Sequence, residues 1–359
     1  MMSNSLFYLL VSALLYGISL LLPFFMKRSI LFGVRIPLDS KAERFIRATI
    51  RQYRFLISAL FLGYILISLV ILNYYFNLTL FEILIFGDLV IYLSVIYYFN
   101  KKTLRWKNSI LASQATQNTI VVDTAFREGK VTISPWWFLI SFAVVGLHFI
   151  YVNFQYDRFP QRLAVHYNIQ GQADRFIPKS WWAVNQLPLI SLGIVLLMFG
   201  IFYVIRRSKQ EIDPSNPDIS VHQDRRFRYY WSVYVVIVSI LMSAYFFYFS
   251  CLILFSYFSV WIIWSVPFLI IAFTIGLALY TGQSGWRLKE KSPLSSERIK
   301  AMRDDDRYWI GGLFYCNKND PAIFVEKRIG IGWTINFCNI WGVLILAVTL
   351  LLILIALLL

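Results

Sequence analysis

The feature that most constrains this chain is a series of eight apolar runs, each about 20 residues long. A run of that length crosses the hydrocarbon layer of a bilayer, about 30 Å thick, when it forms a helix rising 1.5 Å per residue. The composition agrees, because 58% of the residues are hydrophobic and 15% are charged, whereas soluble domains have roughly 45–50% and 25%. We therefore predict an all-α, polytopic integral membrane helix bundle with about eight transmembrane helices. The runs cover residues 5–26, 55–76, 80–99, 136–154, 183–205, 229–251, 259–281 and 337–359.

The basic residues predict the orientation, because cytoplasmic loops of membrane proteins are enriched in Lys and Arg. Four alternate connections, residues 27–54, 101–135, 206–228 and 282–336, hold 30 of the 34 Lys and Arg residues. The other four lie in residues 155–182. We predict a multi-pass protein of the plasma membrane with both termini outside, residues 155–182 outside and residues 282–336 in the cytoplasm.

The formal net charge of +15 fits these topology signals and contact with anionic lipid headgroups. No zinc-ligand spacing, arginine-rich tail or helix-turn-helix segment favours a nucleic-acid partner. The three cysteines, Cys251, Cys316 and Cys338, include no CxxC pair and indicate no disulfide framework. We interpret Cys251 and Cys338 as small packing residues.

The connections between the runs carry local patterns of their own. Residues 40–54 have the pattern of a basic amphipathic helix, which typically lies on the membrane surface. Residues 119–133 predict a short hairpin with Glu128 and Gly129 at its turn. Residues 304–336 alternate strand-like runs with turns and predict a small β-rich appendage. We interpret its acidic run, residues 304–306, as a solvated patch.

These patterns divide the chain into five regions. They are an N-terminal three-span region (1–135), a two-span domain with its outer loop (136–206), two further spans (207–281), a cytoplasmic module (282–336) and a C-terminal span (337–359).

The outer loop at residues 155–182 holds the first group of candidate site residues. Asn168 to Gly171 reads as a turn, because Asn tolerates left-handed conformations and Gly accepts a positive φ. Such a turn folds His166 back toward Asp174. One interpretation is a ligand site formed by His166, Asn168, Asp174 and Arg175. The other, which we favour, is that hydrogen bonds hold the loop as a compact cap. One His and one Asp are too few to predict a metal site, and no cofactor is predicted.

Two ionisable residues lie inside the predicted spans, where they are costly and usually face protein or water. Asp88 and His148 fall at similar depths on consecutive antiparallel helices, so we predict that they form an intramembrane polar pair. A structural hydrogen bond between two spans and a proton or cation relay are the two interpretations.

The outer loop also resembles a known family. Pro160, His166, Tyr167, Asn168, Gly171 and Asp174 match the loop of bacterial SdpI-like membrane proteins, which carry a domain of unknown function. Gln161 replaces the usual acid of that loop, and Ala164 replaces a common second proline. A second uncharacterised module that often accompanies the first resembles residues 304–337. Its matching positions are Trp309, Gly311, Gly312, Tyr315, Asn317, Asp320, Pro321, Arg328, Gly330, Gly332, Trp333 and Asn336.

The resemblance implies a membrane-embedded immunity or signalling protein, which protects against or senses an extracellular antimicrobial peptide or envelope stress. The outer loop would meet an extracellular peptide, and residues 282–336 would meet a cytoplasmic regulatory protein. The alternative is a small-molecule or ion transporter that uses Asp88 and His148. No metalloprotease HExxH or G-x-S-x-G sequence is present, so we do not predict an enzyme.

Overall fold

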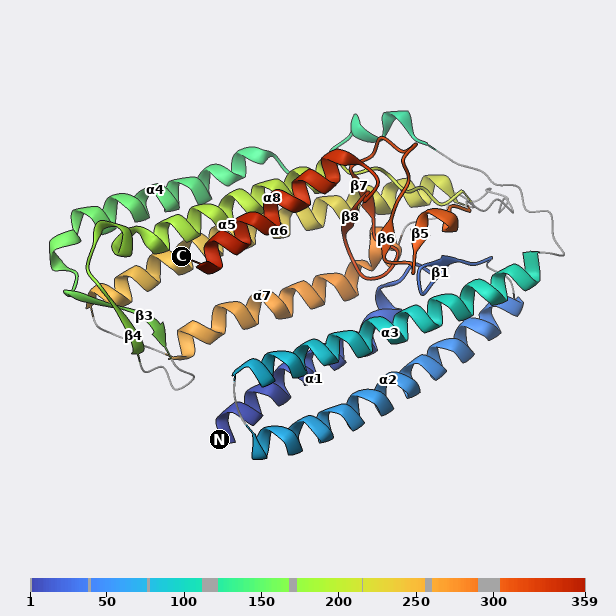
Figure 1. The fold of residues 1–359 in the computed structure, drawn as a ribbon. Helices are drawn as coiled ribbons and strands as arrows, with labels where there is room; N and C mark the ends of the chain where they lie inside the picture. The colour runs from blue at the N-terminus through green and yellow to red at the C-terminus, as the bar shows by residue number, and fades with distance from the viewer. Residues whose placement is uncertain are drawn as a thin grey trace. The chain divides into compact units, whose positions relative to one another are not determined.

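The computed structural model describes residues 2–37, 40–75, 78–111, 122–167, 173–214, 216–255, 260–289 and 304–358. Its long elements are all helices (Figure 1). They are α1 (Met2–Phe25), α2 (Ser40–Tyr74), α3 (Leu78–Leu111), α4 (Phe138–Phe154), α5 (Trp181–Arg207), α6 (Pro217–Phe255), α7 (Val260–Thr281) and α8 (Ile340–Leu358).

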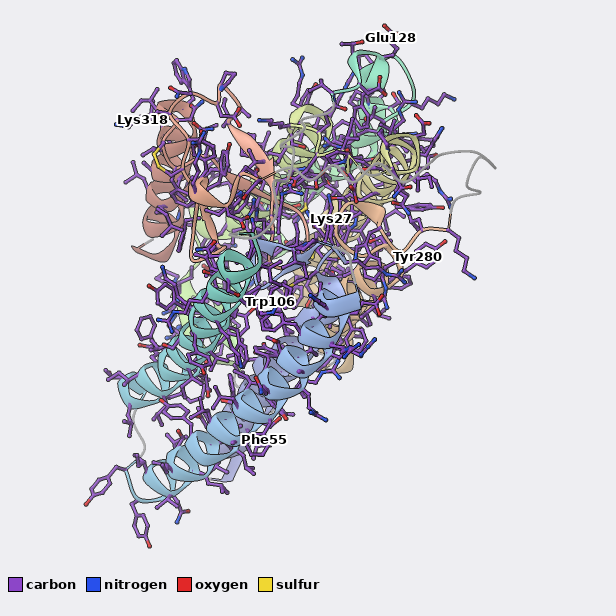
Figure 2. The ribbon with its side chains drawn as sticks, turned by 90° about the vertical axis from the view of Figure 1, so that its right-hand side faces the viewer. Lys27, Phe55, Trp106, Glu128, Tyr280 and Lys318 are labelled. Atoms are coloured by element: carbon purple, nitrogen blue, oxygen red, sulfur yellow. A yellow bond between two sulfur atoms is a disulfide. The ribbon has the colours of Figure 1, made fainter. Side chains whose placement is uncertain are left out.

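The prediction of a polytopic helical membrane protein is confirmed. Within the described residues, seven helices, α1 to α7, are long and apolar enough to cross a membrane. The eighth, α8, has 19 residues and is therefore about 28 Å long, close to the thickness of the hydrocarbon layer. Large apolar side chains lie on the outer surfaces of these helices. Phe55 on α2, labelled in Figure 2, is 76% exposed, as expected of a side chain that faces lipid.

The described strands form four antiparallel hairpins. They are β1 (Ile30–Leu31) with β2 (Val34–Arg35), β3 (Arg162–Tyr167) with β4 (Ala173–Pro178), β5 (Trp309–Ile310) with β6 (Phe314–Tyr315), and β7 (Phe324–Glu326) with β8 (Trp333–Ile335). The last two hairpins are the predicted β-rich appendage. A parallel bridge between Tyr315 and Asn336 joins them.

Residues 40–54 are not a separate helix on the membrane surface. They form the first part of α2, which continues through Arg54 without a break to Tyr74. Phe45 stacks on Trp106 of α3, with 4.1 Å between the ring centroids, and Ile46 and Ile50 pack against a core of buried residues. The apolar side of this segment is therefore covered by protein, which supports a helix that extends beyond the membrane.

The hairpin predicted at residues 119–133 is also wrong within the residues that are described, 122–133. Thr124–Arg127 is a 3-10 helix, and no strand follows it there. The guanidinium of Arg225 donates hydrogen bonds to the carbonyl oxygens of Ala125 and Phe126. In a hairpin these carbonyls would accept hydrogen bonds from the main chain of a partner strand. Here they accept hydrogen bonds from the side chain of Arg225. Residues 119–121 lie outside the described part of the chain.

The chain folds as two compact units that interleave along the sequence. Unit 1 comprises residues 1–124, 208–224 and 278–359, and unit 2 comprises residues 125–207 and 225–277. In unit 1, α1, α2 and α3 pack side by side (Figure 1). Residues from all three, together with Phe32 and Ile329, form one buried apolar core. In unit 2, α4 packs along α5, and polar side chains join α6 to α4 and α7.

Candidate functional site

The segment at residues 155–182 contains the β3–β4 hairpin, whose base is anchored in unit 2. Leu163 pairs with Ile177 across the two strands. Leu163 and Phe159 are buried against Val152 of α4 and Val184 of α5. The amide of Lys179 also donates to the carbonyl of Gln161, at 2.8 Å. Apolar burial and main-chain bonding therefore fix the base on the ends of two membrane helices.

The other end of the hairpin carries the candidate residues. His166 of β3 lies opposite Arg175 of β4, and the register shifts on both sides of His166. Asp174 and Arg175 are exposed, and so is Phe176, at 45%. The antiparallel pairing requires the chain to reverse between β3 and β4, where the sequence predicts a turn. Asn168 lies outside the described residues.

A network of buried charges connects the appendage to the rest of unit 1. Arg328 is 2% exposed. Its guanidinium donates to the carboxylates of Asp305 and Asp306 and, at 2.7 Å, to the carbonyl of Gly33. It also lies over the ring of Trp309, 4.9 Å from the centroid. This single side chain therefore holds three segments together.

Two further cations complete the network. The Nε of Arg35 on β2 donates to Asp305 at 2.9 Å, and the same guanidinium pairs with Glu211. Lys107 of α3, 2% exposed, donates to Asp306 at 2.6 Å. Asp305 and Asp306 are therefore not a solvated patch, whereas Asp304 is exposed while it pairs with Lys107. Three cations from distant parts of the sequence pair with the carboxylates of Asp305 and Asp306, as a buried carboxylate requires.

A second polar group lies beside this network. Lys209 donates to Asp320 at 2.6 Å, and the Tyr315 hydroxyl donates to the same carboxylate oxygen at 2.8 Å. Burial raises the pKa of the Asp320 carboxyl, but hydrogen bonds from Lys209, the Ala322 amide and Tyr315 outweigh burial and hold the pKa below its usual range. Burial, and then the hydrogen bond to Asp320, raise the pKa of Tyr315.

The pocket at this group is too small for an organic ligand. Its volume is about 10 Å³, which is room for about one water molecule. Basic and acidic side chains both line the pocket. We therefore interpret it as a small gap in the ionic network and not as a ligand site. The lining residues are Lys209, Gln210, Glu211, Asp305, Trp309, Tyr315, Asp320, Val325 and Glu326.

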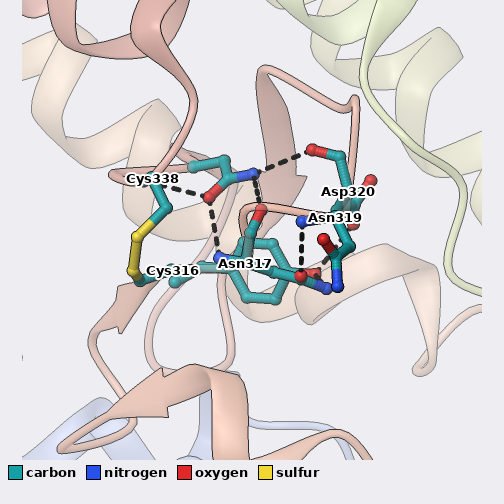
Figure 3. Close-up of a disulfide and its surroundings, with 7 residues drawn as sticks. Cys316, Asn317, Asn319, Asp320 and Cys338 are labelled. Carbon is teal, nitrogen blue, oxygen red and sulfur yellow. Dashed lines mark hydrogen bonds between the residues drawn. A yellow bond between two sulfur atoms is a disulfide. The ribbon is translucent and has the colours of Figure 1, made fainter.

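Asn336 organises the junction between the appendage and α8. Figure 3 shows the surroundings of Cys316, Asn317 and Cys338 at this junction. Its side-chain oxygen accepts from the amides of Asn317 and Cys338, and its side-chain nitrogen donates to the carbonyls of Asn317 and Asp320. These bonds place the Cα atoms of Cys316 and Cys338 4.7 Å apart, and the two residues form a disulfide. Cys338 is therefore not simply a packing residue. The expectation of no disulfide was wrong because two cysteines 22 positions apart give no local signal for a pairing that the Asn336 bonds help to form.

The two intramembrane residues each have a polar partner inside their own unit. Asp88 of α3 is fully buried and accepts a hydrogen bond from Ser12 of α1. His148 of α4 is fully buried, shares a hydrogen bond of 2.7 Å with Ser250 of α6, and stacks on Phe247. A pairing of Asp88 with His148 would join residues of different units, and it stays a prediction.

Two family models match parts of the chain. A domain of unknown function (DUF1648) matches residues 143–192, which include most of α4, the β3–β4 hairpin and the first part of α5. A family of unknown function (DUF5808) matches residues 318–343, which include β7, β8, Asn336 and the start of α8. No curated protein and no solved structure matches the chain. The matches overlap the two segments that the sequence singles out, residues 155–182 and 304–337.

Sequence reasoning missed Arg35 and Lys107 as members of a buried network. Each lies among other basic residues in a connection, so charge counting assigned both to the topology signal. Arg328 is one of the positions at which residues 304–337 resemble the second uncharacterised module. This match is the sequence signal that distinguishes Arg328 from the other cations.

Proposed function

We propose that this protein lies in the plasma membrane with both termini outside and, as in SdpI-like proteins, protects against or senses an extracellular antimicrobial peptide or envelope stress. The observation that carries the proposal is the β3–β4 hairpin. Its base is anchored between two membrane helices, while Asp174, Arg175 and Phe176 are exposed on β4. An anchored hairpin presents its exposed side chains in one fixed arrangement, which lowers the entropy cost of binding a ligand.

The exposed residues suit a peptide. Arg175 and Asp174 offer charges of both signs, and Phe176 offers an apolar contact. The open edges of a two-stranded hairpin also present unpaired backbone groups to which an extended peptide can add as a strand. The match to the domain of unknown function covers this hairpin and the helices below it, which supports treating them as one functional element.

In a signalling role, the cytoplasmic module at residues 282–336 would bind a cytoplasmic regulatory protein. We propose no enzymatic activity and no nucleic-acid partner. The second candidate function, transport of a small molecule or ion, is favoured by the burial of Asp88 and His148 inside apolar helices.

The proposal is tested in a strain that lacks this gene and is complemented with variants. Its survival is measured against a panel of membrane-active peptides. We expect Asp174→Ala with Arg175→Ala to abolish protection against at least one peptide while the membrane abundance stays normal. Asp157→Ala with Arg158→Ala is the matched control, since it removes the same two charges from exposed positions of the same segment away from the β3–β4 pairing.

Normal abundance and normal protection in the first variant would defeat peptide recognition by the hairpin. A fall in abundance or melting temperature for that variant would assign Asp174 and Arg175 to the structural cap. Loss of protection in both double variants would show a response to net charge rather than recognition by β4.

A further inference from the structure

The three N-terminal helices bring four polar side chains together inside unit 1. Tyr8 and Ser12 come from α1, Ser68 from α2 and Asp88 from α3. Each of the four is 0% exposed. Apolar side chains surround them, because Tyr8 belongs to a buried cluster with Leu72 and Leu84. Asp88 lies about 15 Å along α3 from its first residue at 1.5 Å per residue, which is well inside the apolar stretch.

Most of the oxygen atoms in this group have no hydrogen-bond partner among the described residues. The Ser12 hydroxyl donates to one carboxylate oxygen of Asp88. The other carboxylate oxygen of Asp88, the Tyr8 hydroxyl and the Ser68 hydroxyl are buried and have no hydrogen-bond partner within 3.5 Å among the described residues. The Tyr8 hydroxyl lies beside Ser12, Ser68 and Asp88. Unbonded oxygens from three helices therefore converge on one place, where each would be costly to bury without a partner.

The charge in this group is also uncompensated. No basic side chain of the described residues forms an ion pair with Asp88, whose hydrogen-bond partner is the Ser12 hydroxyl. An ionised carboxylate in an apolar interior needs a positive charge beside it. One carboxylate balances a monovalent cation, and carboxylate and hydroxyl oxygens are ligands that hard cations prefer.

We propose that Tyr8, Ser12, Ser68 and Asp88 form an intramembrane binding site for one Na⁺ ion. Asp88 supplies the charge, and the three hydroxyl oxygens replace part of the hydration shell of the ion. The bound ion links α1, α2 and α3 through ligands from each of them. The site is separate from the β3–β4 hairpin and does not depend on peptide recognition.

Thermal unfolding of the full-length protein in detergent tests the site, with NaCl compared with choline chloride at equal ionic strength. A ligand that binds only the folded state stabilises it, so we expect Na⁺ to raise the Tm of the wild type. Asp88→Asn and Ser68→Ala should lose this rise, and Ser68→Ala serves if Asp88→Asn does not fold. Ser141→Ala is the matched control, because Ser141 is a fully buried and equally unbonded serine of α4, and it should keep the full rise.

Equal Tm values for the wild type in the two salts would overturn the proposal. An undiminished rise in Ser68→Ala or in Asp88→Asn would overturn it as well. A Tm that responds to pH but not to Na⁺, with the response lost in Asp88→Asn, would assign the carboxylate to proton uptake and also contradict a Na⁺ site.

Discussion

Replacing Arg328 with Met removes the charge at the centre of the ionic network while it keeps an unbranched chain of similar length. Loss of one partner from a buried ion pair costs about 3–5 kcal/mol, because the other charge stays buried. Here each carboxylate keeps one cation, since Arg35 remains on Asp305 and Lys107 remains on Asp306. We therefore expect a value near the lower limit, about 3 kcal/mol.

Hydrogen exchange of the backbone amides in residues 304–336 measures this loss in the full-length protein in detergent. At 1.36 kcal/mol per factor of ten, a loss of about 3 kcal/mol speeds exchange through local opening by roughly 100-fold. Arg47→Met is the control, because Arg47 pairs with Glu43 at 3.4 Å on the surface, with side chains 71% and 65% exposed. An exposed pair of this kind contributes about 1 kcal/mol or less.

The same exchange rates in Arg328→Met as in Arg47→Met would refute the argument, since a buried network would then contribute no more than a surface pair. A second arm adds Asp305→Asn to Arg328→Met. Asp305 loses one of its two cations in Arg328→Met. Neutralising Asp305 should therefore recover part of the stability, because its charge is then only partly compensated and Arg35 keeps Glu211 as a partner.

Three further outcomes are expected. The pKa of Asp320 is lower in the folded protein than in the unfolded chain. The carboxylate therefore stabilises the fold above the unfolded pKa of about 3.9, and this contribution is lost as the pH falls from that value through the folded pKa. Hydrogen exchange of residues 304–336 should become faster over this acid range in the wild type and should not do so in Asp320→Asn. Leu163→Ala should destabilise the β3–β4 hairpin by about 2–5 kcal/mol, while Phe176→Ala, at an exposed position, should change its exchange by much less. In a cysteine-free background, an impermeant thiol reagent should label Asp174→Cys in intact cells and leave Glu128→Cys unlabelled; the reverse pattern would contradict the predicted orientation.

The parts of the fold that the sequence predicts depend on one-dimensional patterns. A span of about 20 apolar residues has few alternatives, so the helices and their order follow from hydropathy alone. The strand-like runs predicted in residues 304–336 include β8, Trp333–Ile335, where aromatic and β-branched residues are bounded by turns. The end of such a pattern is less informative. Arg54 lies just before the apolar run at residues 55–76, but the helix begins earlier, at Ser40, because Trp106 of α3 covers Phe45.

The ionic network could not be predicted in this way. Arg35 and Asp305 are 270 residues apart in the chain, and nothing local to either residue shows that the other is its partner. Judged from local sequence alone, an acidic run and a basic connection are each predicted to be exposed to solvent. Burial of such charges depends on their meeting in three dimensions, and local sequence patterns do not encode that meeting. The disulfide was missed for the same reason.

The disulfide between Cys316 and Cys338 makes a covalent ring that contains Lys318, an exposed residue labelled in Figure 2. A tryptic cut after Lys318 leaves α8 attached to the rest of the protein until a reductant is added. The cytoplasm keeps thiols reduced, whereas the outer side of the membrane allows disulfides to persist. If intact cells are treated with a permeant thiol-blocking reagent before lysis, the tryptic fragments of a cytoplasmic appendage therefore separate on a non-reducing gel. Those of an external appendage stay joined, so one cleavage site reports on which side of the membrane the appendage lies.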